Sequence, residues 1–214
     1  MTVLRLALLG GFEFRMACGT GIDVPRRKSR ALLAYLAMHR GEAVPRDRLA
    51  SLLWGDGTDA QARGNLRKTL SRLKQALPEN ARACLDAGPK LVRLRLEQVE
   101  VDAVRFEDLT GQGTPEALAR AAALWRGPFL ELQADCGGAF EDWLTLERRR
   151  LEERVRGVLA KLLDHHMVIG AVEAAVEAAL ALLAIDPLQE DVHRKLMRLY
   201  AVQGRIGSAA RQYQ

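Results

Sequence analysis

The sequence has 214 residues, 49% of them hydrophobic, which is enough for one large domain or two small ones, each with its own core. Residues 1–101 hold 18 Lys and Arg against 10 Asp and Glu, a formal +8, whereas residues 102–214 hold 14 against 17, a formal −3; this contrast indicates a polyanion-binding domain joined to one with another task. The three cysteines are far apart and form no CxxC pair, which argues against a disulfide framework or a zinc site and favours a reducing cytoplasm.

The first residues of the chain favour strands. Val3–Arg15 is rich in Val, Leu and Phe and is broken by Gly10-Gly11, which predicts a strand pair with a tight turn or bulge. Ile22–Val24 can add a short third strand. The apolar run is too short to span a bilayer and lacks the features of a signal peptide, so we expect a small leading sheet and no membrane association.

Two helices are predicted next. The first follows Pro25 and covers residues 26–41, with Leu32 and Leu36 on its apolar face. The second is short, covers residues 46–54 with Trp54 turned inward, and ends at the glycines of residues 55–57.

The most informative stretch is a basic helix predicted over residues 61–77, which contains five cations and no acidic residue. Its leucines recur at spacings of 4, 3 and 4 and therefore share one helical face: Leu66, Leu70, Leu73 and Leu77. The opposite face carries side chains that can donate to base edges or phosphate oxygens. Such a helix can also be a solvated charged surface, and its position decides between the two readings.

That position is third, directly before a predicted β-hairpin. Residues 83–86 and 90–96 flank a turn, and Arg93 and Arg95 lie on the open face of the hairpin. Strands, three helices and a hairpin in this order are typical of a winged helix-turn-helix, whose third helix enters the major groove. We therefore predict an α+β winged helix-turn-helix DNA-binding domain over residues 1–101.

Residues 102–214 are predicted to form an all-α domain. Helices are expected at residues 103–109, 115–125 and 140–166, followed by three more from residue 171 onward. Ile169 and Ile206 begin similar segments 37 positions apart, close to the roughly 34-residue period of tetratricopeptide helix pairs. Because Gln214 follows without a stop signal, we expect the helical domain to be truncated at this end; unusually brief final turns are the alternative.

Several segments together resemble the Streptomyces antibiotic regulatory protein (SARP) family of transcription activators. The similar segments are LLGGFEFR, KSRALLAYLAMHRGEAVPRDRLASLLWGD, SRLKQAL, VDAVRF and LWRGPFL. The resemblance implies an OmpR-type winged helix at residues 1–101 and a bacterial transcriptional activation domain at residues 102–214. The chain has Gly64-Asn65 and Arg67-Lys68-Thr69 where relatives often carry Asn-Ala and a Gln-Thr-His-like run, so the operator sequence does not transfer.

The resemblance also implies a function: a sequence-specific activator that binds direct repeats in double-stranded DNA upstream of promoters, as a homodimer at least on DNA, and recruits RNA polymerase. By position on the third helix, we predict base contacts from Lys68, Thr69, Arg72, Asn65 and Ser71. Phosphate contacts are predicted for Arg63, Arg67, Lys74, Arg93 and Arg95. The resemblance places the polymerase-contact loop at Trp54, Gly55, Asp56 and Asp59.

Two alternatives stay open: the DNA-binding front end of a larger signal-responsive regulator, and a tetratricopeptide-like adaptor that binds only proteins. Salt-dependent binding to duplex DNA distinguishes the adaptor. An enzyme is not expected, because the sequence has no GxSxG, HExxH, Walker or paired-carboxylate signature. No cofactor or metal is predicted either, since the consecutive His165 and His166 face different directions on a helix.

Overall fold

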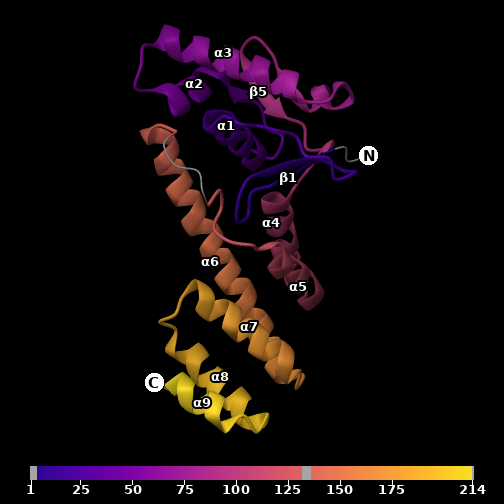
Figure 1. The fold of residues 1–214 in the computed structure, drawn as a ribbon, viewed down its shortest axis with the longest axis vertical. Coiled ribbons are helices and arrows are strands. Elements are labelled where there is room, and N and C mark those ends of the chain that lie inside the picture. The colour runs from indigo at the N-terminus through magenta and orange to yellow at the C-terminus, as the bar shows by residue number, and fades with distance from the viewer. Residues whose placement is uncertain (1–3, 132–135, 214) are drawn as a thin grey trace. The chain divides into compact units, whose positions relative to one another are not determined.

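The computed structural model describes residues 4–131 and 136–213 of the chain, which packs into two compact units (Figure 1). The N-terminal unit consists of Met1–Arg105 and Arg126–Arg149, and the C-terminal unit of Phe106–Trp125 and Arg150–Gln214. Helices α4 (Asp102–Gln112) and α6 (Gly138–Val168) each contribute residues to both units. Strands and helices come first and helices alone follow, which confirms the predicted fold class.

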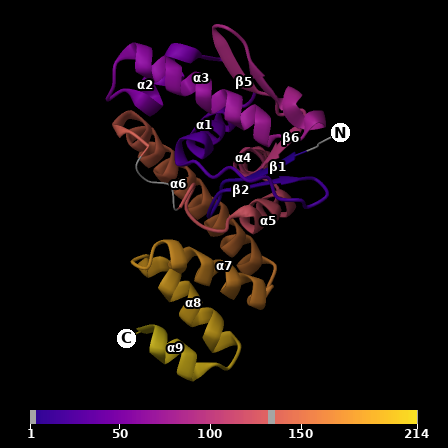
Figure 2. The same ribbon diagram turned by 45° about the horizontal axis from the view of Figure 1, so that its top comes forward.

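The leading sheet has three strands in the order β2, β1, β6. Strand β1 (Leu4–Ala7) pairs antiparallel with β2 (Glu13–Met16), as predicted, and parallel with β6 (Val99–Val101), which was not predicted (Figure 2). The strand expected at Ile22–Val24 is wrong. Gly21 forms an isolated bridge with Arg15 and Ile22 N donates to Phe14 O over 2.8 Å, but residues 22–24 form no strand. Pro25 follows and has no amide N–H with which to extend a ladder.

Three helices lie at the predicted places: α1 (Arg27–Met38), α2 (Arg46–Trp54) and α3 (Asp59–Ala76). Helix α3 begins with a capping box, in which Thr58 Oγ1 accepts from the Gln61 amide and Gln61 Oε1 accepts from the Thr58 amide. The helix therefore starts at Asp59, ahead of the predicted basic stretch. The leucine stripe is buried as predicted, with each side chain at most 3% exposed: Leu66, Leu70, Leu73 and Leu77.

The predicted hairpin is confirmed and forms part of a second three-stranded sheet. After a short 3-10 helix, η1 (Glu79–Cys84), strands β4 (Leu85–Ala87) and β5 (Leu91–Leu94) pair antiparallel. Strand β3 (Val44–Pro45) was missed and pairs with the other edge of β5. Arg46 Nη1 donates to Gly88 O over 3.0 Å, so the start of α2 is bonded to the tip of this hairpin, which we call the wing.

The segment of residues 126–149 completes the N-terminal unit. Phe129 forms an isolated antiparallel β-bridge with Leu9, and Leu130 N donates to Leu8 O over 2.8 Å. The centre of the Trp143 ring lies 4.9 Å from the centre of the ring of Tyr35, a buried residue of α1. Residues 126–149 therefore pack against the leading sheet and α1, although they come later in the sequence. The predicted boundary between the DNA-binding and activation domains, after residue 101, stays a prediction.

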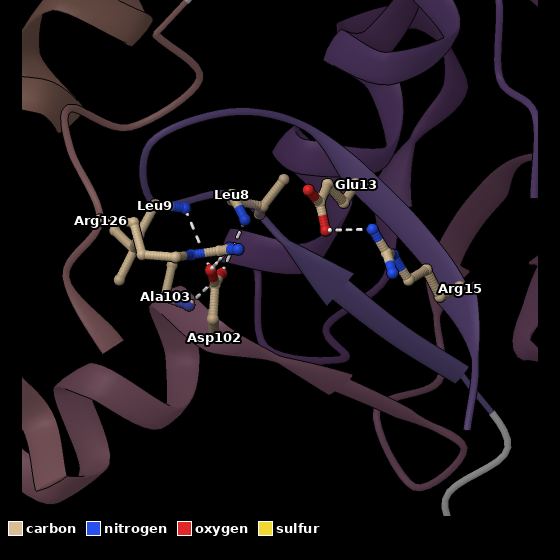
Figure 3. A network of polar contacts seen from close by, with 7 residues as sticks. All are labelled: Leu8, Leu9, Glu13, Arg15, Asp102, Ala103 and Arg126. Carbon is tan, nitrogen blue, oxygen red and sulfur yellow. Dashed lines mark hydrogen bonds and ion pairs between the residues drawn. The ribbon is translucent and has the colours of Figure 1, made fainter. Parts of the chain in front are cut away.

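The Asp102 carboxylate is the polar centre of this unit (Figure 3). It accepts hydrogen bonds from the amides of Leu8 (2.7 Å), Leu9 (3.1 Å) and Ala103 (2.7 Å), and from Arg126 Nη2 at 3.2 Å. The Asp102 side chain is only 12% exposed. One carboxylate therefore joins the turn after β1, the start of α4 and the segment that contains Arg126.

The C-terminal unit continues with α5 (Pro115–Leu124), α7 (Val172–Ile185), α8 (Glu190–Val202) and α9 (Ile206–Tyr213). Helices α6 and α8 end in the same way, at Gly170 (φ +71°) and Gly204 (φ +70°). In both, the amide of the next residue donates five positions back, from Ala171 to His166 O and from Arg205 to Tyr200 O. These glycines are 34 positions apart, the period of tetratricopeptide repeats.

The cysteines differ in accessibility and in pKa. Cys18 is exposed, and its hydrogen bond with the Thr20 hydroxyl lowers the pKa of the thiol, whereas burial raises the pKa of Cys84 to about 11. Cys136 is also buried. We expect iodoacetamide at mildly alkaline pH to label Cys18 in the native protein and all three cysteines only after unfolding, because the thiolate is the reactive form. Mass spectrometry checks this, and rapid native labelling of Cys84 would contradict it.

Candidate nucleic-acid interface

The exposed face of α3 is polar and cationic along its length. It carries most of the predicted base- and phosphate-contacting residues: Arg63, Asn65, Arg67, Lys68, Ser71 and Arg72 are exposed, and Lys74 is half-buried. Thr69 differs, because it is only 6% exposed and lies on the buried side. Lys68 and Arg72 form no ion pair within residues 4–131 and 136–213, so their charges are available to a ligand.

Between α3 and the wing, the surface has a hollow of about 790 Å³. Arg63 and Arg67 of α3 line it together with Lys90 at the wing tip. Arg63 Nη1 lies 3.8 Å from Asp47 Oδ1, but both side chains are more than half exposed, so this ion pair is weak and leaves the arginine available. Lys90 was not predicted as a contact, although its place at the start of a predicted strand, directly after the turn of the hairpin, was a usable signal.

Arg93 and Arg95 project from β5 and the residue after it, and both contact Asp86 of β4. The distances to Asp86 Oδ2 are 3.2 Å for Arg93 Nε and 3.0 Å for Arg95 Nη2. The hydrogen bond from Arg95 contributes most to lowering the pKa of Asp86. The two arginines thus keep one surplus positive charge between them, and their predicted phosphate contacts stay a prediction.

A second group of cations lies at the start of α1 and was missed from the sequence. Arg26 and Arg27 are exposed, and Lys28 Nζ donates to Leu53 O over 2.6 Å while lying 5.4 Å from the centre of the Trp54 ring. With Lys68 and Arg72 they line a hollow of about 340 Å³, which we call the α1–α3 pocket. The run of basic residues directly after Pro25, at a predicted helix start, was a signal that could have identified them.

The predicted polymerase-contact loop joins α2 to α3. Gly55, Asp56 and Asp59 are exposed, but Trp54 is half-buried beneath Lys28 rather than fully inward. A Cβ at Gly55 would lie 2.6 Å from Ser51 O, so only glycine fits this turn. Asp56 and Trp54 also line a hollow of about 520 Å³ with Gln61 and Lys68 of α3.

Among residues 4–131 and 136–213, no helix has the length and apolar character needed to cross a lipid bilayer. The same residues contain no group of three His, Cys, Asp or Glu side chains placed to bind a metal ion. Arg148, part of a basic triplet in the sequence, donates to the carbonyl oxygens of Phe129 (2.8 Å) and Leu130 (2.5 Å) and therefore has a structural role.

Three helices, a wing and a cationic third helix define a winged helix-turn-helix DNA-binding protein with a helical second part. Comparison with known families agrees. Residues 23–86 match the family described as transcriptional regulatory protein, C terminal, and residues 94–214 match the bacterial transcriptional activator domain. The chain therefore belongs to the bacterial transcriptional activator domain family, in the two-domain arrangement of the Streptomyces antibiotic regulatory proteins.

Curated relatives share this arrangement at low identity. The chain is 30% identical to the transcriptional regulator RedD of Streptomyces coelicolor, over 91% of this chain and 58% of RedD. It is 27% identical to the transcriptional regulatory protein EmbR of Mycobacterium tuberculosis, over 98% of this chain and 56% of EmbR. The structure of M. tuberculosis EmbR in complex with a low affinity phosphopeptide superposes with a TM-score of 0.71 at 25% identity, covering 100% of this chain and 58% of EmbR. The chain thus spans little more than half of these relatives.

Proposed function

We propose that the chain binds double-stranded DNA sequence-specifically and activates transcription. The observation that carries this proposal is the exposed face of α3, where Lys68 and Arg72 have no acidic partner among the described residues. The same helix also lines two cation-rich hollows. A helix of this kind, placed third and flanked by a wing, suits the major groove, and the flanking cations suit the two phosphate backbones. Membership of a family of transcription regulators supports the same function.

Within this proposal the side chains divide by position. Lys68, Arg72, Asn65 and Ser71 contact bases, since they share the exposed face of α3. Arg63, Arg67 and Lys74 contact phosphates, with Arg93 and Arg95 of the wing contributing through their surplus charge.

Activation requires a second contact, which we assign to the loop between α2 and α3. Asp56 and Asp59 are exposed there and carry negative charge, so they can bind a basic surface of RNA polymerase. Direct repeats would place two protomers head to tail on DNA. The proposal gives the chain no catalytic step and locates it in the cytoplasm, where bacterial DNA lies.

Selection of bound sequences from random duplex DNA tests the proposal. We expect one enriched motif, present as a direct repeat, whose spacing gives the distance between protomers. No enrichment, with no salt-dependent binding to any duplex, would contradict the proposal and favour the adaptor function instead.

Arg67→Ala is expected to weaken binding to all duplexes by the same factor. Because each phosphate contact contributes about 0.9 to the slope of log K against log salt concentration, the slope should fall by about this amount. Gel-shift titrations at several salt concentrations measure it. Lys161→Ala is a matched control, since Lys161 is an exposed cation of α6 in the C-terminal unit, and it should leave the slope unchanged.

A further inference from the structure

Two residues that carry a hydroxyl group line the α1–α3 pocket. Ser29 (4% exposed) and Thr69 (6% exposed) are the buried polar residues of the described chain, and both line this pocket. Neither side-chain hydroxyl forms a hydrogen bond with any of those residues. Neither hydroxyl oxygen is among the side-chain atoms that are fully shielded from solvent without a partner, so each stays accessible at the pocket and can donate to a ligand that supplies hydrogen-bond acceptors.

The charge around these hydroxyls specifies the ligand further. The pocket wall contains five cations and no acidic side chain: Arg26, Arg27, Lys28, Lys68 and Arg72. Helix α1 also points its positive end here, with no acidic residue in its first turn and no side chain capping it. In the first turn of α1 the Ser29 amide donates to Arg26 O over 3.0 Å, so the amides of Arg27 and Lys28 are those that can donate to an anion.

These features together fit a tetrahedral oxyanion. A phosphate group offers several acceptor oxygens to the two hydroxyls and the helix amides, and negative charge to the cations. The aromatic ring in the wall, Trp54, has Lys28 Nζ 5.4 Å from its centre, so a cation already lies over the ring on this side. The pocket also adjoins the exposed face of α3 through Lys68 and Arg72.

We propose that the α1–α3 pocket seats one phosphate group of the DNA backbone, with the Ser29 and Thr69 hydroxyls donating to its oxygens. This inference rests on the proposed DNA binding and deepens it. It gives Thr69, which was predicted to contact a base, a contact with the backbone instead. The phosphate fixes the register of α3 in the groove, because Lys68 and Arg72 of the base-contacting face also line the pocket.

Thr69→Val tests the proposal, with Thr69→Ser as the matched variant that keeps the hydroxyl. Since hydrogen bonds to charged groups contribute about 1.5–3 kcal/mol, Thr69→Val should weaken binding about tenfold or more for selected and random duplexes alike. The salt slope should not change, because no charge is removed, and Thr69→Ser should bind like the wild type. Ser29→Ala, measured in the same way, serves as a second variant if Thr69→Val does not fold.

A second arm identifies the source of the phosphate. Duplexes with one methylphosphonate at each backbone position in turn should show one position at which Thr69→Val causes no further loss. If no position does so, but inorganic phosphate stabilises the wild type and not Thr69→Val in thermal melts, the pocket binds a free phosphate compound and its DNA role is wrong. Wild-type affinity of both Thr69→Val and Ser29→Ala would overturn the pocket altogether. If the wild type itself binds no duplex, the proposed function fails instead.

Discussion

Arg72→Ala is expected to lower the ratio of affinities for the selected operator and random duplex DNA by about 5- to 150-fold. The reason is geometric: Arg72 lies on the exposed face of α3 and forms no ion pair with the described residues, so its guanidinium can donate to a base edge. A bidentate contact of this kind discriminates against the wrong base by about 1–3 kcal/mol. Competition gel shifts with operator and random duplexes measure the ratio.

Arg67→Ala is the comparison for this experiment. Both residues are exposed arginines on α3, but Arg67 lines the wing-side hollow, so its loss should weaken both duplexes equally and leave the ratio unchanged. Arg72 also lines the α1–α3 pocket. If Arg72→Ala lowers the salt slope by about 0.9 while the ratio stays at its wild-type value, Arg72 contacts phosphate and not a base.

Asp102→Ala should destabilise the protein by about 3 kcal/mol, which lowers Tm by roughly 6–12 °C for a chain of this size. Removal of the carboxylate leaves three amides and the Arg126 guanidinium without their acceptor in a site where Asp102 is 12% exposed. Urea unfolding followed by tryptophan fluorescence measures the loss. Glu97→Ala is the control, because Glu97 is an exposed acidic residue of the same unit; an equal loss in both variants would contradict the role of Asp102.

The stabilisation by Asp102 is expected to depend on pH. Burial raises the pKa of Asp102, because desolvation outweighs the amides and the guanidinium that favour the charged form. The folded protein therefore binds this proton more tightly than the unfolded chain, so the contribution of Asp102 to stability is full below 3.8 and falls as pH rises through the raised pKa. The stability difference between wild type and Asp102→Asn should be larger at acidic than at neutral pH.

The elements predicted correctly are those with a local pattern. The leucines of α3 repeat with the helical period, and Val92 and Leu94 alternate with arginines along β5, so neighbouring residues alone indicate each structure. Strands β3 and β6 have two and three residues and no pattern of their own. They exist because Val44 meets Val92 and Leu4 meets Val99 across long separations in sequence.

Thr69 shows the limit of a helical wheel. Its position beside the polar face suggested a base contact, but the packing of α3 against α1 and α2 buries it. Arg93 and Arg95 show a related limit: alternation placed them on the open face, whereas strand register placed Asp86 opposite Arg93. In both cases the partner comes from another element, which a one-dimensional pattern does not contain.

The sequence by itself determined that α3 is a helix with an apolar side toward a core and a cationic side away from it, and that a wing follows. Those properties depend on residues within a few turns or strands of each other. Only the tertiary structure decided that Arg26, Arg27 and Lys28 lie beside Lys68 and Arg72, and that Ser29 and Thr69 share one pocket. That arrangement depends on the packing of α1 against α3, two helices separated in sequence by β3 and α2, so no local pattern could specify it.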